Sequence, residues 1–242
     1  MTIALIVIQS AMPATQAISA TQPHDVLPSS IAARLRIDVV SQHLRPGATI
    51  TEADVALRFS VARPTARRAI DALVADGLLH REANHAARIP VLTANDISDL
   101  FDARAIIETA AMASLAVSGA IPADALTAHR ALRAAKPAGP FASHDIAFHR
   151  ALVRGQPSPR LTRMHTVLMG EIELGIGQVQ AAHLLTSGEV ARQHQGILDA
   201  IIAGDQDASA RLTREHIHGA RDRLLAHMNS DQTPPSMETR SW

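Results

Sequence analysis

An aspartate and three histidines in the second half of the chain have the types and spacing of metal ligands. Asp145 and His149 are four residues apart in a stretch whose apolar residues recur with a helical period, so their side chains leave one helix face about one turn apart. His194 and His216 each lie in a further segment of helical periodicity. Three helices could therefore direct one carboxylate and three imidazoles into a bundle core, a ligand set that suits zinc, nickel or manganese.

The same four residues have two other interpretations. The chain contains 13 histidines, and Asp/His pairs at this spacing arise by chance on helix surfaces, so the histidines of a metal-free binding module could simply be core residues. Three histidines with a carboxylate also describe the catalytic centre of a metallo-hydrolase. No neighbouring Asp or Glu is evidently free to act as the general base that a hydrolase requires.

The composition favours a helical protein with a basic N-terminal module. Of 242 residues, 47% are hydrophobic, with many alanines, and only 2% are aromatic, which favours close-packed helices over sheets. The absence of cysteine excludes disulfides and thiolate metal sites. The net charge is zero, but residues 28–92 carry nine Arg against six Asp and Glu, a local charge of +3. This asymmetry suggests that the first part binds nucleic acid.

The two ends of the chain do not read as parts of a folded domain. No apolar run approaches the ~18 residues of a membrane span. Residues 3–8 are apolar but shorter than the core of a signal peptide, and no Lys or Arg precedes them. We expect residues 1–27 to be a disordered leader, or to follow from a wrongly chosen start codon, and residues 230–242 to be a flexible tail. We expect the protein to be cytoplasmic.

Residues 28–92 have the outline of a winged helix-turn-helix. Helices are predicted at 31–43, at 51–59 and at 64–76, the second capped by Thr51. Pro64 is well placed at a first helical position, and Gly77 at a helix end. Residues 78–81 and 87–91 are predicted to form two short strands around a turn.

The third predicted helix begins with a cluster of arginines. Arg63 and Arg67 are four residues apart and lie on one face at the helix N-terminus, where a recognition helix meets base edges and phosphates. Arg68, one position round, is expected to contact phosphate or an acidic neighbour. The alternative interpretation is a solvated surface rich in Arg.

Residues 44–47, 55–70 and 73–79 resemble the DNA-binding domain of GntR-family regulators. That family usually reads Val-Ser-Arg-Thr-Pro-Val-Arg-Glu-Ala-Leu along the recognition helix. This chain keeps both arginines, but it has Ala62 for the usual Ser or Thr, Pro64-Thr65 for Thr-Pro, and Arg68 for Glu, while Ala86 replaces a common Gly of the wing. The resemblance implies DNA contacts from seven residues: Arg45, Arg63, Thr65, Arg67, Arg68, His85 and Arg88.

Residues 93–229 are predicted to be helical, with a cap at Asn95 and breaks at Gly119, 136–140, 155–159 and Gly204. This half resembles the FCD ligand-binding domain of the FadR subfamily. The matching features are Arg104 with Glu108, Asp145-x-x-Phe148-His149, His194 followed by Ile197-Leu198-x-Ala200-Ile201, Gly204-Asp205 and His216; Ser158 replaces a common Asn. In metal-binding members, one Asp and three His at these positions ligate a divalent ion beneath an effector pocket. The resemblance thus implies Asp145, His149, His194 and His216 as metal ligands.

Together the two resemblances imply a mainly α protein that regulates transcription and is not an enzyme. A homodimer would read a palindromic DNA operator, with repression relieved by an effector. A small carboxylate effector would bind at the metal, most simply zinc, while Arg104 pairs with its charge. The alternative role for Arg104 is a salt bridge to Glu108 within its own helix.

Overall fold

The computed structural model describes residues 27–136 and 139–231, and the mainly α fold expected from the sequence is confirmed. The N-terminal part contains α1 (Pro28–Val40), β1 (Thr49–Ile50), α2 (Glu52–Phe59), α3 (Arg63–Ala75) and β2 (Ala87–Arg88). The helical part contains α4 (Ala94–Ser118), α5 (Ala123–Ala134), α6 (Ala142–Gly155), α7 (Pro159–Ala181), α8 (Ser187–Ile202) and α9 (Gln206–Asp231). The expected leader up to residue 26 and the expected tail beyond residue 231 lie outside the described residues. Ser230 and Asp231, assigned to that tail, end α9.

The three N-terminal helices pack around a small core that explains their sequence pattern. Ile31 and Leu35 of α1 meet Ile70 and Leu73 of α3, and all four side chains are buried. The hydroxyl of Thr51 accepts a hydrogen bond from the backbone N–H of Asp54 and so caps α2, as predicted. Beyond α3, Gly77 has a φ of +78°, a conformation that a residue without a Cβ adopts freely.

The predicted hairpin was partly wrong. β2 pairs antiparallel with β1, and no strand was expected at β1. Residues 78–81 contribute only one bridge, between His80 and Arg88. The backbone N–H groups of Leu78 and Leu79 instead donate to the carbonyl of Leu73, where they close the end of α3 and are lost to a β-ladder.

The first long helix of the bundle begins at a capping box, two residues before the cap predicted at Asn95. Thr93, rather than Asn95, is the N-cap of α4: its hydroxyl accepts from the N–H of Asp96, and the Asp96 carboxylate accepts from the N–H of Thr93 at 2.8 Å. Gly119 ends the helix in a left-handed conformation, as predicted.

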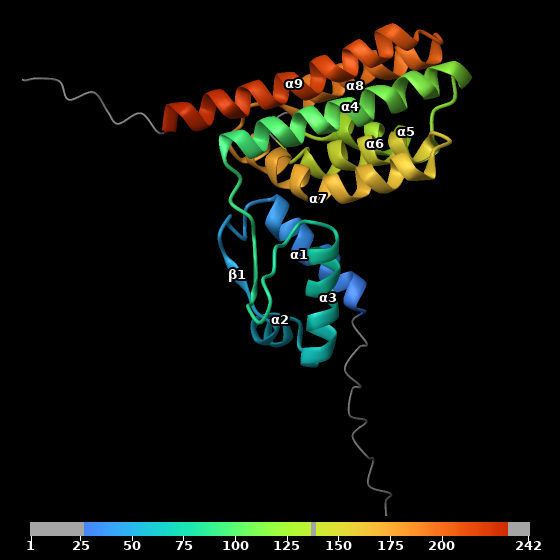
Figure 1. Cartoon of the computed structure of the whole chain (residues 1–242). Helices are drawn as coiled ribbons and strands as arrows, with labels where there is room; N and C mark the ends of the chain where they lie inside the picture. Colours follow the sequence, from blue (N-terminus) through green and yellow to red (C-terminus); the bar gives the residue numbers. More distant parts are fainter. Residues whose placement is uncertain (1–26, 137–138, 232–242) are drawn as a thin grey trace, which may run out of the picture.

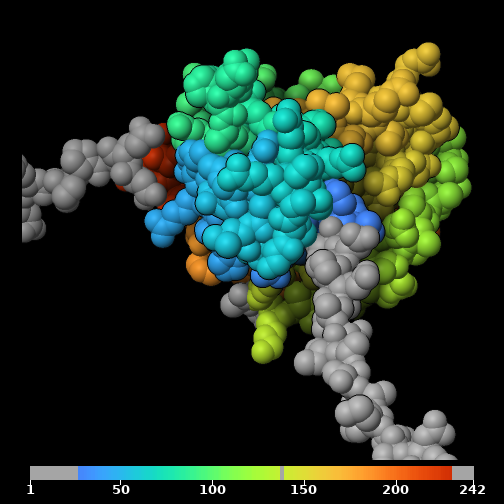
Figure 2. All heavy atoms as spheres, turned by 90° about the horizontal axis from the view of Figure 1, so that it is seen from below, coloured from blue at the N-terminus to red at the C-terminus, as the bar shows by residue number. Residues whose placement is uncertain are grey.

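The helical part is a bundle in which α4 and α9 run side by side along one edge, with α8 next to them (Figure 1). α5, α6 and α7 form the other side of the bundle. Seen from below, the N-terminal part projects in front of this bundle (Figure 2). Within the described residues, no helix alone is long and apolar enough to cross a membrane; only α4 with α5, bent by 112°, pass such a test as a pair.

The N-terminal part packs closely against α7 through glycines. A Cβ at Gly170 would lie 1.7 Å from the carbonyl oxygen of Asp76, and one at Gly177 would lie 2.2 Å from that of Val40. These two glycines are seven residues apart, about two helical turns, so they share one face of α7. Glu173 lies between them in the sequence, on the same side. A side chain at either glycine would therefore force the backbone of α7 or of the N-terminal part to shift.

Candidate metal centre and nucleic-acid interface

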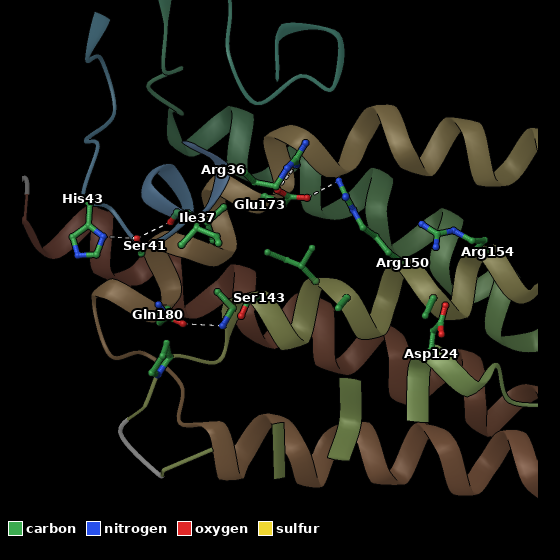
Figure 3. A pocket seen from close by; sticks show the side chains of 16 residues that line it. Arg36, Ile37, Ser41, His43, Asp124, Ser143, Arg150, Arg154, Glu173 and Gln180 are labelled. Atoms are coloured by element: carbon green, nitrogen blue, oxygen red, sulfur yellow. Dashed lines mark hydrogen bonds and ion pairs between the residues drawn. The ribbon is translucent and has the colours of Figure 1, made fainter. Parts of the chain in front are cut away.

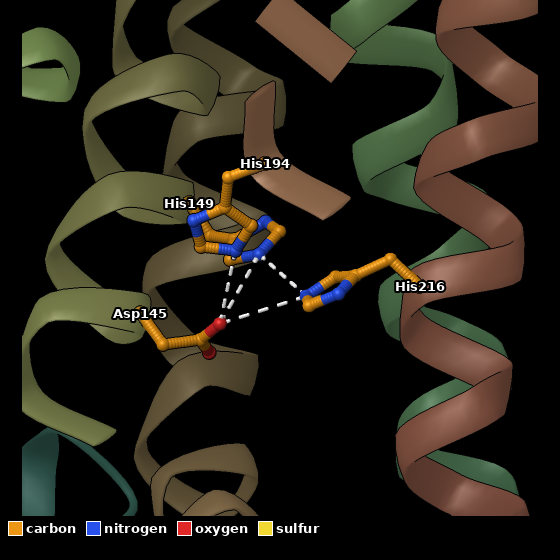
Figure 4. Close-up of side chains that lie close together, drawn as sticks. All are labelled: Asp145, His149, His194 and His216. Carbon is orange, nitrogen blue, oxygen red and sulfur yellow. Dashed lines mark hydrogen bonds and ion pairs between the residues drawn. The ribbon is translucent and has the colours of Figure 1, made fainter. Parts of the chain in front are cut away.

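The structure brings the four residues singled out as metal ligands together in the core of the bundle (Figure 4). α6 carries Asp145 and His149, α8 carries His194 and α9 carries His216. All four side chains are buried, and each offers one ligand atom within 4.8 Å of the others. The cluster therefore ties together three helices that are far apart in the sequence.

The separations within the cluster match the coordination sphere of one ion. Oδ1 of Asp145 lies 3.1 Å from Nε2 of His194, 3.5 Å from Nε2 of His216 and 3.7 Å from Nε2 of His149. Ligand atoms held about 2.1 Å from a tetrahedral zinc ion are roughly 3.4 Å apart. No large movement of the side chains is needed to enclose such an ion.

The acceptor oxygens beside two histidines determine which ring nitrogens face the centre. Nδ1 of His149 lies 2.5 Å from Oε2 of Glu108, and Nδ1 of His216 lies 2.7 Å from Oε1 of Gln193. Carboxylate and amide oxygens only accept hydrogen bonds, so both Nδ1 atoms carry the ring proton. The two Nε2 atoms then present lone pairs to each other at 3.1 Å. A cation between them removes this repulsion, and the donor set fits a divalent metal ion.

The charges of the cluster agree with this role. Burial alone raises the pKa of the Asp145 carboxyl, but His149, His194 and His216 outweigh it and hold the pKa well below its usual range. Burial lowers the pKa of His194 to about 3, which keeps its imidazole neutral, as a metal ligand must be. The His194 ring also stacks on Phe148 with centroids 3.9 Å apart.

Glu108 is the second anionic centre of the core, with more partners than the Arg104 expected from the sequence. Besides His149, it accepts from Nε of Arg104 at 2.8 Å, and it contacts Nε2 of His165 at 3.0 Å. Burial raises the pKa of Glu108, but Arg104 and His149 outweigh this effect, and the pKa stays well below its usual value. The Arg104/Glu108 spacing was the available signal for Glu108, whereas nothing in the sequence marks His165 or Gln193.

Arg104 makes the salt bridge to Glu108 that was one alternative, and it also faces the cluster. Its buried NH2 group has no hydrogen-bond partner among the described residues and lies 3.9 Å from Oδ2 of Asp145. A cavity of about 10 Å³ adjoins Arg104, Asp145 and His216; Phe141, Ile176, Val179, Leu185, Val190 and Ala220 form its apolar wall. This volume holds about one water molecule. An effector pocket at this point requires the apolar wall to move outward.

The residues singled out for DNA contact all lie in the N-terminal part. Thr65 is half-buried, and the other six are exposed: Arg45, Arg63, Arg67, Arg68, His85 and Arg88. Ala62, the N-cap of α3, makes no side-chain cap. Pro64 has no backbone N–H, and the N–H of Thr65 donates to the Ala62 carbonyl at 2.9 Å, so the exposed side chains are the main donors at this helix end. Nε of Arg67 lies 3.8 Å from carboxylates of Glu52 and Asp71, long and exposed pairs that cost little to exchange for a phosphate.

Comparisons with known proteins agree with this arrangement. Residues 22–89 match the family described as bacterial regulatory proteins, gntR family, and residues 99–219, half of the chain, match the FCD domain. The HTH-type transcriptional regulator BphR of Paraburkholderia xenovorans is 26% identical over 200 residues, 77% of this chain and 80% of that protein.

Two further likenesses extend over most of the chain. A protein of Paenarthrobacter nicotinovorans named as a probable D-xylose utilization operon transcriptional repressor is 22% identical over 204 residues, 78% of this chain and 86% of its own length. A crystal structure of a GntR-type regulator from Rhodococcus sp. RHA1 superposes with a TM-score of 0.67 at 25% identity, covering 82% of this chain and 97% of the other.

Proposed function

This chain belongs to the GntR family of transcriptional regulators and carries an FCD domain, and on that premise we propose that a buried divalent metal ion links a small carboxylate effector to operator binding. The observation that carries the proposal is the pair of facing Nε2 atoms of His149 and His216, 3.1 Å apart. The metal is the simplest way to satisfy both lone pairs together with the Asp145 carboxylate and His194. Zinc suits three imidazoles and one carboxylate best, and nickel or manganese are the alternatives.

The effector part of the proposal depends on Arg104. Its NH2 group is buried without a hydrogen-bond partner among the described residues, and Arg104 lines the small cavity beside Asp145 and His216. A buried cationic donor without a partner is costly, and a carboxylate supplies the acceptor. The same carboxylate would lie beside the metal ligands. Effector and ion would thus share one site, with the apolar wall displaced to admit the effector.

The DNA part of the proposal assigns the contacts of a regulator dimer. Arg63 and Arg67 would contact base edges and phosphates, with Arg45, His85 and Arg88 on the flanks. A homodimer would place two such helices on the half-sites of a palindromic operator. We propose repression as the regulatory sense, in line with the name of the Paenarthrobacter relative.

The mechanism that these residues support is the positioning of the metal ligands and of the bound carboxylate. Glu108 and Gln193 hold the protons at Nδ1 of His149 and His216, which leaves Nε2 free to bind a cation. A bound divalent cation would supply positive charge that attracts a carboxylate. Arg104 would orient that carboxylate through its free N–H groups. No step of bond making or breaking is required, in keeping with the family's identity as regulators rather than enzymes.

The experiment replaces Arg104 with Met, which keeps the volume of the side-chain stem and removes the guanidinium. DNA selected from a random pool by the wild-type protein is titrated with protein in the presence of acetate, lactate, malonate or succinate. We expect at least one acid to change wild-type affinity by about 5–150-fold, the usual range of coupling between sites, and to have no effect on Arg104→Met.

The exposed Arg133 on α5 provides the matched control, Arg133→Met, which should respond as the wild type does. An equal response of the Arg104 variant would show that Arg104 serves only its salt bridge with Glu108. A wild-type protein indifferent to all four acids would remove the carboxylate effector from the proposal.

A further inference from the structure

A second cavity, of about 700 Å³, lies at the junction of the two parts (Figure 3), and none of its lining residues belongs to the metal cluster. Ile37 and Val40 of α1 line one side, and Ile146 and Ala147 of α6 line the other. Small-molecule sites in proteins have volumes of about 300–1,000 Å³ and are mostly apolar. The cavity therefore has the size and the lining of a ligand site, in contrast to the closed space beside Arg104.

The polar end of this cavity is built around a buried carboxylate. Glu173 of α7 is fully buried and lies between two arginines: NH1 of Arg36 is 2.6 Å from one carboxylate oxygen, and NH2 of Arg150 is 2.5 Å from the other (Figure 3). Arg36 also pairs with Asp76 at the end of α3. Glu173 is thus already satisfied by cations, and its charge is not available to a ligand.

Two arginines at this end of the cavity keep hydrogen-bond donors that no described residue accepts from. Nε of Arg150 is buried and has no hydrogen-bond partner in the described part of the chain. Arg154, one turn further along α6, makes no hydrogen bond or ion pair of its side chain with any described residue, and the charged lining comprises three arginines against Asp124 and Glu173. Burial lowers the pKa of Arg150, and repulsion from Arg36 and Arg154 adds to this against the opposing effect of Glu173.

We infer that the junction cavity binds an amphipathic monocarboxylate, with its apolar body against α1 and α6 and its acid group against Nε of Arg150 and the guanidinium of Arg154. A carboxylate there would satisfy the unpaired donor and reduce the repulsion among the three guanidinium groups. The apolar body would cover Ile37, whose side chain is 54% exposed.

This site is separate from the metal cluster although both use α6. Successive helical residues are about 100° apart, so Ile146, Arg150 and Arg154 lie on a different face from Asp145 and His149. One wall of the cavity belongs to α1, which packs against α3. A ligand in this cavity therefore contacts the DNA-binding part directly, and it touches the Arg36–Glu173–Arg150 connection that spans the junction.

The test uses the full-length, metal-loaded protein and two probes, the fluorescent amphipathic anion 8-anilino-1-naphthalenesulfonate and the fatty acid decanoate. We expect one dye per chain, displaced by decanoate. Arg154→Gln should weaken both probes about ten-fold, and Ala147→Trp, which places an indole in the cavity from an exposed helix position, should abolish binding. Arg133→Gln, on the exposed surface of α5, should bind both probes as the wild type does.

Circular dichroism and thermal melting of each variant establish that the fold is kept. Dye binding undiminished in Ala147→Trp would overturn the inference. A wild-type protein that binds neither probe would also overturn the inference. If Ala147→Trp then converts a dimer to a monomer in sedimentation, a second copy of the chain covers the cavity. His194→Ala should lose metal and keep the dye; if it loses the dye, the probe binds at the metal cluster and the junction site is refuted.

Discussion

Nε2 of His149 and Nε2 of His216 face each other at 3.1 Å in the middle of the helical bundle. Glu108 and Gln193 hold the ring protons of these two histidines on their opposite nitrogens. Two neutral imidazoles would avoid this arrangement, since neither can donate to the other. A cation between the rings converts the repulsion into two bonds, and most of the predictions below follow from that relationship.

Removal of the metal is expected to destabilise the protein. A ligand that binds only the folded state contributes about 4 kcal/mol at a thousandfold excess over its Kd, and a chain of this size melts ~2–4 °C lower per kcal/mol lost. A chelator should therefore lower the Tm by several degrees, and zinc, nickel or manganese should restore it. The measurement is thermal melting followed by circular dichroism.

The variants separate this effect from ordinary packing. His149→Ala and His194→Ala should begin at the lowered Tm and ignore the chelator, while His144→Ala and His218→Ala, outside the cluster, should respond like the wild type. If a chelator moves the Tm of none of these proteins, the histidines are packing residues only.

Glu108 is expected to position His149 for the metal. Glu108→Gln keeps the shape of the side chain but removes its charge, and the new amide can also turn its NH2 group toward Nδ1 of His149. The ring proton is then held less firmly on Nδ1, so the affinity for zinc should fall about 10–100-fold, as for other outer partners of metal ligands. Competition with a chromogenic zinc chelator measures this change. Thr109→Ser, at the neighbouring position of α4, is the control and should leave affinity unchanged. Wild-type zinc affinity in Glu108→Gln would mean that His149 is oriented without Glu108.

Arg63 and Arg67 are expected to carry specific DNA binding. A lost base contact costs ~1–3 kcal/mol, and a lost phosphate contact weakens binding to all sequences alike and reduces the salt dependence by about one ion. Arg63→Ala and Arg67→Ala should each abolish footprinting protection at the wild-type working concentration, with unchanged circular dichroism. Arg214→Ala, exposed on α9, should protect normally. Protection by both recognition-helix variants would disprove the assignment of α3.

We expect glycine substitutions to change stability in opposite directions, depending on whether the glycine lies at the contact of α7 with the N-terminal part. A methyl group at Gly170 or Gly177 would collide with the backbone of Asp76 or Val40, and such overpacking typically costs about 1–3 kcal/mol. Gly219 has nothing within 4 Å of an added Cβ, so Gly219→Ala should stabilise α9 by roughly 0.5–1 kcal/mol. Thermal melting of the three variants checks this contrast; equal Tm values for Gly170→Ala and Gly219→Ala would contradict it.

Local sequence signals were sufficient for most of the helices, whereas the four clustered side chains were singled out by their spacing together with the resemblance to the FCD domain. Asp145 and His149 share a helix turn, and the helix patterns around His194 and His216 direct both rings inward. The contacts of Glu108 with His165, and of Glu173 with Arg36, join residues 57 and 137 positions apart, and no local pattern encodes such pairs. The strand at Thr49–Ile50 was missed for the same reason, because its partner follows two helices later.

The most direct test of the metal centre is the metal content of the untagged, full-length protein by inductively coupled plasma mass spectrometry. We expect close to one divalent ion per wild-type chain and per His144→Ala chain, and none in the double variant His149→Ala/His216→Ala. A wild-type protein without stoichiometric metal, which also fails to take up zinc, nickel or manganese on dialysis, would contradict this expectation.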